Sequence, residues 1–195
     1  LEDTIAGILG TYRAISLFSG DDFGTPDQHV DLLYGNHYLP KYTFGTGWEL
    51  VPNNMGATPL YGPSGIWNLF NNYTWTMDVY NEELFVGTMD WSFLLHGVVG
   101  ELIAGAFSFE VKDGGANYRE IGGYEFPSYF FGADLFRFPT PDVYAVPVST
   151  NGMGNDKNYG IRTMIADEER LYLGTANPMN LDPDGGWELI GLSED

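Results

Sequence analysis

The stretch RLYLGTANPMNLDPDGGWELIGL (residues 170–192) decides the fold, because two of its parts occur elsewhere in the chain. Its GWEL segment also occurs at residues 47–50, and its LYLGT segment is matched by LFVGT at residues 84–88. Repeated segments of this kind indicate one structural unit used several times along a chain.

The alignment extends well beyond these short matches. TMDVYNEELFVGT (76–88) aligns without a gap with TMIADEERLYLGT (163–175), and six positions are identical, including the Gly-Thr pair that ends each segment. A weaker third copy lies upstream, where YRAI (12–15) resembles IRTM (161–164) and DLLYGN (31–36) resembles RLYLGT. We therefore predict three repeat units in one domain that covers residues 1–195.

Spacing supports the same division. Thirteen residues separate Gly35 from Trp48 and also Gly174 from Trp187. In the middle copy the position of the tryptophan is taken by Ala133, 46 residues after Gly87, which implies an insertion of 33 residues. Without insertions the period is about 50 residues, which is the length of a blade in several repeat proteins.

Each repeat is predicted to consist of antiparallel strands. Apolar residues alternate with others in TMDVYNEELFVGT, around a predicted turn at Asn81-Glu82, and the later copy has the same pattern around DEE (167–169). The GWEL and ADLF segments add a third strand, and the residues that follow leave room for a fourth. The predicted units are residues 8–51, 66–138 and 145–192.

The quoted stretch resembles the repeats of secreted bacterial β-propeller proteins, in which a LYLGT strand and a variable loop precede a Gly-Gly-aromatic strand. The resemblance implies an all-β fold, a β-propeller-like array of about three four-stranded blades. It also implies that Trp48 and Trp187 occupy equivalent strands and pack between neighbouring blades. Closed propellers have four to eight blades, so we expect this chain to be part of a larger ring.

Two insertions interrupt the repeats, at about residues 16–29 and 92–128. The second contains FLLHGVVGELIAGAF (93–107), in which apolar residues recur at helical spacing, and this predicts one short helical insertion. The most apolar run, residues 91–107, is too short and too interrupted to span a bilayer, so no membrane insertion is expected. Inserted loops carry binding groups in many folds, which makes both insertions candidate binding regions.

The chain has 27 acidic and 8 basic residues, for a net charge of −19, and no cysteine. Such a surface repels phosphate backbones, so nucleic acid is excluded as a partner. The absence of cysteine excludes disulfides, thiolate catalysis and zinc–cysteine sites.

The acidic, glycine-rich turns favour Ca²⁺ as the one candidate cofactor, because this ion binds carboxylate and carbonyl oxygens. The same residue types are also ordinary turn formers, so the pattern has a purely structural alternative. The candidate ligands lie in three turns: Asp21, Asp22, Asp27, Asn155, Asp156, Asp182 and Asp184.

Two functions of different classes fit this sequence. The first is a structural or binding module of an exported protein, extracellular or periplasmic, that assembles with further blades or with a partner chain. Its expected partner is another protein chain or the missing blades of one precursor. The second is a polysaccharide-active hydrolase or lyase with its site at the propeller mouth, for which carbohydrate is the partner.

Overall fold

The computed structural model describes residues 11–95, 111–113, 118–121, 124–178, 180–181 and 183–193. Strands dominate these residues, so the predicted all-β class is confirmed. The chain divides into two compact units, Leu1–Leu69 and Phe70–Asp195. Three short 3₁₀ turns lie among the described residues: η1 (Trp91–Leu95), η2 (Ser128–Phe130) and η3 (Gly152–Gly154).

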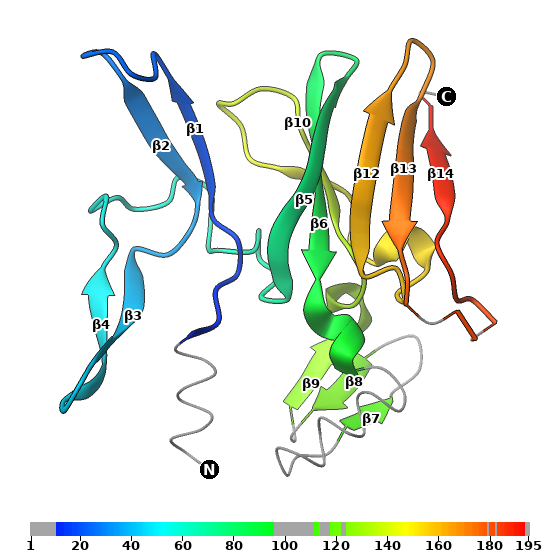
Figure 1. The fold of residues 1–195 in the computed structure, drawn as a ribbon, viewed down its shortest axis with the longest axis horizontal. Coiled ribbons are helices and arrows are strands. Elements are labelled where there is room, and N and C mark those ends of the chain that lie inside the picture. The colour runs from blue at the N-terminus through cyan, green and yellow to red at the C-terminus, as the bar shows by residue number, and fades with distance from the viewer. Residues whose placement is uncertain are drawn as a thin grey trace. The chain divides into compact units, whose positions relative to one another are not determined.

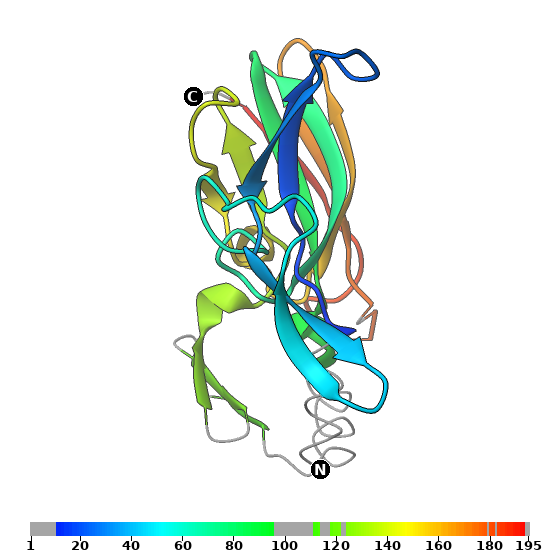
Figure 2. The ribbon, with the colours of Figure 1, turned by 90° about the vertical axis from the view of Figure 1, so that its left-hand side faces the viewer.

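The first unit consists of two antiparallel hairpins (Figures 1 and 2). A third segment, residues 60–62, runs beside β2, where the Leu60 amide donates to the Leu32 carbonyl at 2.9 Å. The apolar side chains of Leu32, Leu33 and Tyr34 are buried. The strands are β1 (Leu17–Asp21) paired with β2 (His29–Tyr34), and β3 (Tyr38–Thr43) paired with β4 (Gly47–Pro52).

Two sequence predictions for this unit are wrong. Residues 12–15 form no strand, and the Ile15 carbonyl accepts a hydrogen bond from the Gly65 amide (2.7 Å) in place of a strand ladder. The strand that pairs with β2 is β1, which lies inside the predicted insertion at 16–29. The sequence of β1, LFSGD, is too short and too polar to show the alternating pattern of a strand. It forms a strand because its backbone groups pair with those of β2.

The two GWEL segments are also not equivalent. In the first unit this segment forms β4 and pairs with β3, so that Trp48 lies opposite Tyr42 with ring centroids 5.2 Å apart. In the second unit it leads into β14, which pairs with β13. The matched spacing therefore reflects a local hairpin at residues 38–52, since strand pairing depends on partners that spacing does not specify.

The second unit contains a seven-stranded antiparallel sheet, curled into a half-barrel (Figure 1). We call β5, β6, β10 and β11 the first repeat, and β12, β13 and β14 the second repeat. The bounds are β5 (Asn71–Tyr80), β6 (Glu83–Asp90), β10 (Leu135–Phe138), β11 (Val146–Ser149), β12 (Gly160–Ala166), β13 (Leu171–Ala176) and β14 (Leu189–Leu192).

The strand registers confirm the alignment of these two repeats. Gly87 of β6 lies opposite Leu135 of β10, and Gly174 of β13 lies opposite Leu189 of β14. This register places Ala133 and Trp187 at equivalent positions, as the spacing predicted. The insertion of 33 residues in the first repeat is thus accommodated between β6 and β10 without a change in pairing.

Local details of the hairpins are repeated as well. The ladder of β5 and β6 is irregular between Thr74 and Thr76, and that of β12 and β13 is irregular at the matching place, between Ile161 and Thr163. A bulge of this kind strengthens the twist of a hairpin. The predicted turn at Asn81-Glu82 is confirmed, and both residues have positive φ, as a two-residue hairpin turn of type I′ requires.

One apolar core joins the two repeats. It contains Phe85 and Leu135 from the first repeat and Ile161, Leu171 and Leu173 from the second. Each fully buried side chain of this size stabilises the fold by about 1.5–3 kcal/mol relative to exposure. The core therefore holds the two repeats face to face within the curled sheet.

A buried polar network stabilises the end of the first repeat at which β5 and β10 begin. The Thr88 amide donates to the Asp134 carbonyl (3.0 Å), and the Asp134 amide donates to Thr88 Oγ1 (2.8 Å). Asn71 Nδ2 then donates to Asp134 Oδ2 at 2.7 Å. All three residues are almost fully buried, so these bonds replace the lost contacts with water.

The second repeat contains the same network at matching positions. Thr175 and Glu188 exchange the same pair of bonds, at 2.9 and 2.8 Å, and Asn158 Nδ2 donates to Glu188 Oε2. Asn158, Thr175 and Glu188 correspond to Asn71, Thr88 and Asp134 in the alignment. Asn158 and Thr175 are buried and Glu188 is exposed, so the pattern of polar contacts recurs although its burial differs.

The predicted insertion at 92–128 begins with η1 and contains a small antiparallel sheet. The helix predicted at 93–107 lies outside the described residues, apart from the 3₁₀ turn that ends at Leu95. The strands are β7 (Val111–Asp113), β8 (Tyr118–Ile121) and β9 (Tyr124–Pro127).

The buried network predicts a large effect for Thr88→Val. The substitution keeps the shape of the side chain but removes the acceptor of the Asp134 amide, so we expect a loss of about 1–3 kcal/mol in the free energy of unfolding. Thr140, which is exposed in a turn, provides the control, and Thr140→Val is expected to stay within about 0.5 kcal/mol of the wild type. Urea denaturation measures both values, and equal stabilities for the two variants would contradict the role of the network.

Candidate docking face

One face of the second repeat is a candidate interaction surface. Along β13, Leu171, Leu173 and Thr175 are buried, while Tyr172 and Gly174 point to the opposite side. The buried side packs on the first repeat through the shared core. We call the opposite side the Gly174 face; register adds Ile165 of β12, Leu189 of β14 and the preceding Trp187 to it.

The same face of the first repeat is covered. Leu135 and Ala133 are both 0% exposed, and a Cβ placed on Gly87 would lie 2.7 Å from the Cβ of Ile161. The backbone of β6 thus touches a side chain of the second repeat directly. A residue without a side chain at position 87 makes this close approach possible.

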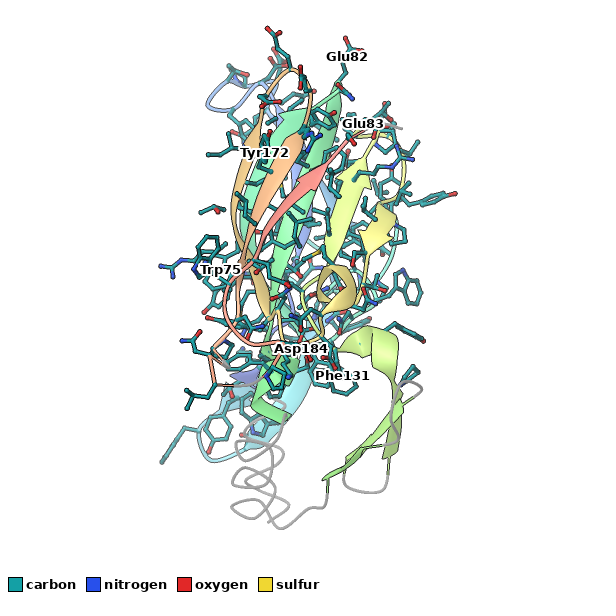
Figure 3. All side chains as sticks on the ribbon, turned by 90° about the vertical axis from the view of Figure 1, so that its right-hand side faces the viewer. Trp75, Glu82, Glu83, Phe131, Tyr172 and Asp184 are labelled. Atoms are coloured by element: carbon teal, nitrogen blue, oxygen red, sulfur yellow. The ribbon has the colours of Figure 1, made fainter. Side chains whose placement is uncertain are left out.

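The Gly174 face itself is uncovered among the residues that the structure describes. Ile165 is 66% exposed, Trp187 73% and Leu189 65%. Figure 3 views the molecule from the side of β12, β13 and β14 and labels Tyr172 on this face. Large exposed apolar side chains that gather on one face mark an interaction site in soluble proteins.

Comparison of the repeats shows how this face differs from its covered counterpart. Trp187 replaces Ala133 and Tyr172 replaces Phe85, and both are residue types enriched in protein interfaces. At the rim, Arg170 takes the place of Glu83, whose carboxylate binds Arg137 with a contact of 2.6 Å. The Gly174 face is therefore apolar at its centre, with a cation at its edge.

The turn between β12 and β13 gives the face a fixed border. Asp167 Oδ1 accepts hydrogen bonds from the amides of Glu169 and Arg170, each at 2.8 Å. These backbone hydrogen bonds, with a smaller contribution from the Arg170 charge, hold the pKa of Asp167 below its usual value. The stabilisation is present above the ordinary carboxyl pKa and is lost as the pH falls through the lowered one.

The candidate calcium ligands do not gather at one place within the described residues. Asp21 ends β1, and Asp22 and Asp27 lie in the exposed turn that follows, where Asp22 has positive φ. In the parts of the chain with described positions, no group of three or more His, Asp or Glu side chains is arranged to hold a metal ion. Asp156 lies between η3 and β12, and Asp182 lies outside the described residues.

Two of these candidates do meet. Asn155 Nδ2 donates to the Asp184 carbonyl at 2.9 Å, which joins the loop before β12 to the loop before β14. Lys157 Nζ lies 3.8 Å from Asp184 Oδ2. Asp184, a predicted calcium ligand, thus has the ammonium group of Lys157 as its positively charged neighbour.

Calcium binding at one of the acidic turns stays a prediction with a direct test. A bound ion present at a hundredfold excess over its dissociation constant adds about 2.7 kcal/mol of stability, so EDTA is expected to lower the melting temperature and Ca²⁺ to restore it. Mg²⁺ at the same concentration is the control for ionic strength. An unchanged melting temperature in protein that elemental analysis shows to contain calcium would contradict the prediction.

A matched pair of substitutions tests the difference between the two faces. Gly87→Ala places a methyl group against Ile161 and is expected to reduce the free energy of unfolding by about 1–3 kcal/mol. Gly174→Ala brings the methyl group against the hydroxyl of Thr163, an exposed side chain that must change its χ1 rotamer, and is expected to cost less than about 1 kcal/mol. Equal losses in thermal or urea unfolding would show that the two faces are not packed differently.

Sequence reasoning identified the repeat but not this face. The signal was present in the alignment, since Leu189 corresponds to Leu135 and Tyr172 corresponds to Phe85. Only the burial of the first repeat shows that these positions belong to a covered surface.

No family model, no curated protein and no solved structure matches the chain. Among the residues described, no helix is long and apolar enough to cross a membrane.

Proposed function

We propose that this chain is a structural or binding module of propeller-like blades, which assembles with a further repeat of the same construction. The observation that carries the proposal is the contrast between two equivalent faces. Leu135 is fully buried under the second repeat, whereas Leu189 at the matching position is exposed. The occupant of the Gly174 face would resemble the side of the second repeat that carries Ile161 and Leu173.

The balance between apolar burial and the cost of association indicates which kind of partner suits this face. Burying each of Ile165, Trp187 and Leu189 contributes about 1.5–3 kcal/mol. Their sum is comparable to the estimated 4–15 kcal/mol that association costs in lost motion and side-chain ordering. A repeat that is tethered in the same chain or preassembled loses less motion on docking, which favours a further blade over a small peptide.

Two further parts of the proposal follow from the acidic composition and the resemblance of the repeats. The module acts outside the cytoplasm, in an extracellular or periplasmic compartment, and a calcium ion at an acidic turn contributes to its stability. The alternative function, a polysaccharide-active hydrolase or lyase, stays a prediction that no observation among the described residues favours.

Assembly through the Gly174 face is tested by the oligomeric state of the purified chain. A second copy can then cover this face with its own Gly174 face, so the wild type is expected to self-associate at tens of micromolar in sedimentation velocity. The variant Ile165→Lys/Leu189→Lys is expected to be monomeric, because two charges at the centre of the face oppose its burial.

The matched control changes two exposed leucines of the first unit, as Leu50→Lys/Leu60→Lys, and is expected to leave self-association unchanged. A wild-type chain that is a monodisperse, cooperatively melting monomer would overturn the proposal. Equal loss of self-association in the control would assign the contact to a different surface.

A further inference from the structure

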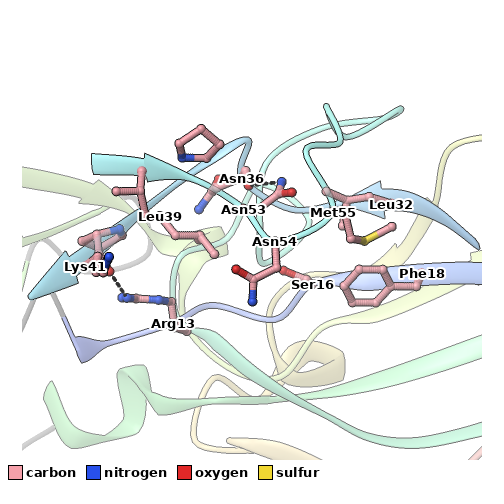
Figure 4. A pocket seen from close by; sticks show the side chains of 13 residues that line it. Arg13, Ser16, Phe18, Leu32, Asn36, Leu39, Lys41, Asn53, Asn54 and Met55 are labelled. Atoms are coloured by element: carbon pink, nitrogen blue, oxygen red, sulfur yellow. Dashed lines mark hydrogen bonds between the residues drawn. The ribbon is translucent and has the colours of Figure 1, made fainter. Parts of the chain in front are cut away.

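The first unit contains a pocket of about 400 Å³ that is independent of the Gly174 face. It lies among residues of β1, β2, β3 and β4 and the loop that follows β4 (Figure 4). Its volume falls in the range of about 300–1,000 Å³ that is typical of small-molecule sites. The pocket is thus large enough for a ligand of one ring or a short chain.

The charges of the pocket are unusual for this protein. Residues 1–69 contain seven acidic side chains but only two basic ones, Arg13 and Lys41, and both line the pocket. No Asp or Glu occurs among its described lining residues. In a chain with a net charge of −19, the only two cations of this unit therefore meet at one place.

Backbone contacts hold the Arg13 side chain beside the segment that carries Lys41. Arg13 Nη2 donates to the Pro40 carbonyl at 2.8 Å, directly before Lys41, and Arg13 Nη1 donates to the Tyr12 carbonyl at 2.7 Å. Glu49 lies opposite Lys41 in the β3–β4 ladder, and its carboxylate accepts a hydrogen bond from Thr43 Oγ1 at 3.3 Å. The two bonds of Arg13 fix the guanidinium at this end of the pocket, and a guanidinium is a group that binds carboxylates.

The rest of the pocket has a different character. Figure 4 shows Arg13 and Lys41 at one end and Phe18, Leu32 and Met55 at the other. Amide side chains lie between the two ends, among them Asn54. A molecule that satisfies both ends has an anionic head and an apolar body.

We propose that this pocket binds a small organic carboxylate with an apolar body, such as a medium-chain fatty acid or an aromatic acid. The carboxylate meets Arg13 and Lys41, and the apolar body contacts Phe18, Leu32 and Met55. Charge-assisted hydrogen bonds to a carboxylate are about twice as strong as neutral ones, so the head group dominates the selectivity. The site requires neither the second unit nor a partner chain.

Isothermal titration of the full chain with octanoate tests the proposal, with 1-octanol as the neutral ligand of equal length. Octanoate is expected to bind in a saturable 1:1 manner, and octanol at least about tenfold more weakly, since it lacks the charge. Raising the salt concentration from roughly 50 to 500 mM is expected to weaken the binding of octanoate and to leave the binding of octanol unchanged.

Two variants of the pocket and one control complete the design. Lys41→Gln and Arg13→Gln are each expected to raise the dissociation constant of octanoate about fivefold or more. Arg162→Gln removes the same charge from an exposed position in the second unit and is expected to have no effect. Far-ultraviolet circular dichroism confirms that each variant is folded.

Three outcomes would overturn the proposal. Equal affinity for octanol and octanoate would show that Arg13 and Lys41 do not contribute to binding the carboxylate. If Arg162→Gln weakened octanoate binding as much as the pocket variants do, the effect would come from the net charge of the chain. Binding of glucuronate but not of octanoate would show that the pocket prefers a sugar ring to an apolar body.

Discussion

The contact between Gly87 and Ile161 is the constraint on which the second unit depends. The missing side chain at position 87 lets β12 approach the backbone of β6, and Ile161 fills the space that a Cβ would occupy. Around this contact Phe85, Leu135 and Leu173 are buried in one apolar core that both repeats share. A larger residue at position 87 would separate the two repeats and reduce the contact area of the whole core.

Buried polar groups give the same unit its register. An amide, a hydroxyl and a carboxylate from three segments of the chain form one network in each repeat, centred on Thr88 and Thr175. Shifting a strand by one residue would leave several of these buried groups without partners, at a cost of about 1–3 kcal/mol for each group. Apolar packing therefore favours the face-to-face arrangement of the repeats, and the polar networks exclude its close alternatives.

The two units present different opportunities for recognition. The second unit offers an apolar surface whose counterpart in the first repeat is covered by the second repeat, and this contrast is the basis for proposing a folded repeat as its partner. The first unit offers a small pocket with Arg13 and Lys41 at one end, apolar side chains at the other and amide side chains between them. A broad apolar surface suits a protein, whereas a pocket with localised charge suits a small anion.

The sequence by itself determined the all-β class, the two hairpins of the second unit, and the equivalence of Ala133 with Trp187. These features depend on alternation, on turn residues and on spacing, which are local properties of the chain. Tertiary structure decided which segments pair, as the different partners of the two GWEL segments show. It also decided which of two equivalent faces is covered and that Arg13 lies beside Lys41, because burial and charge proximity depend on contacts between residues that are far apart in the sequence.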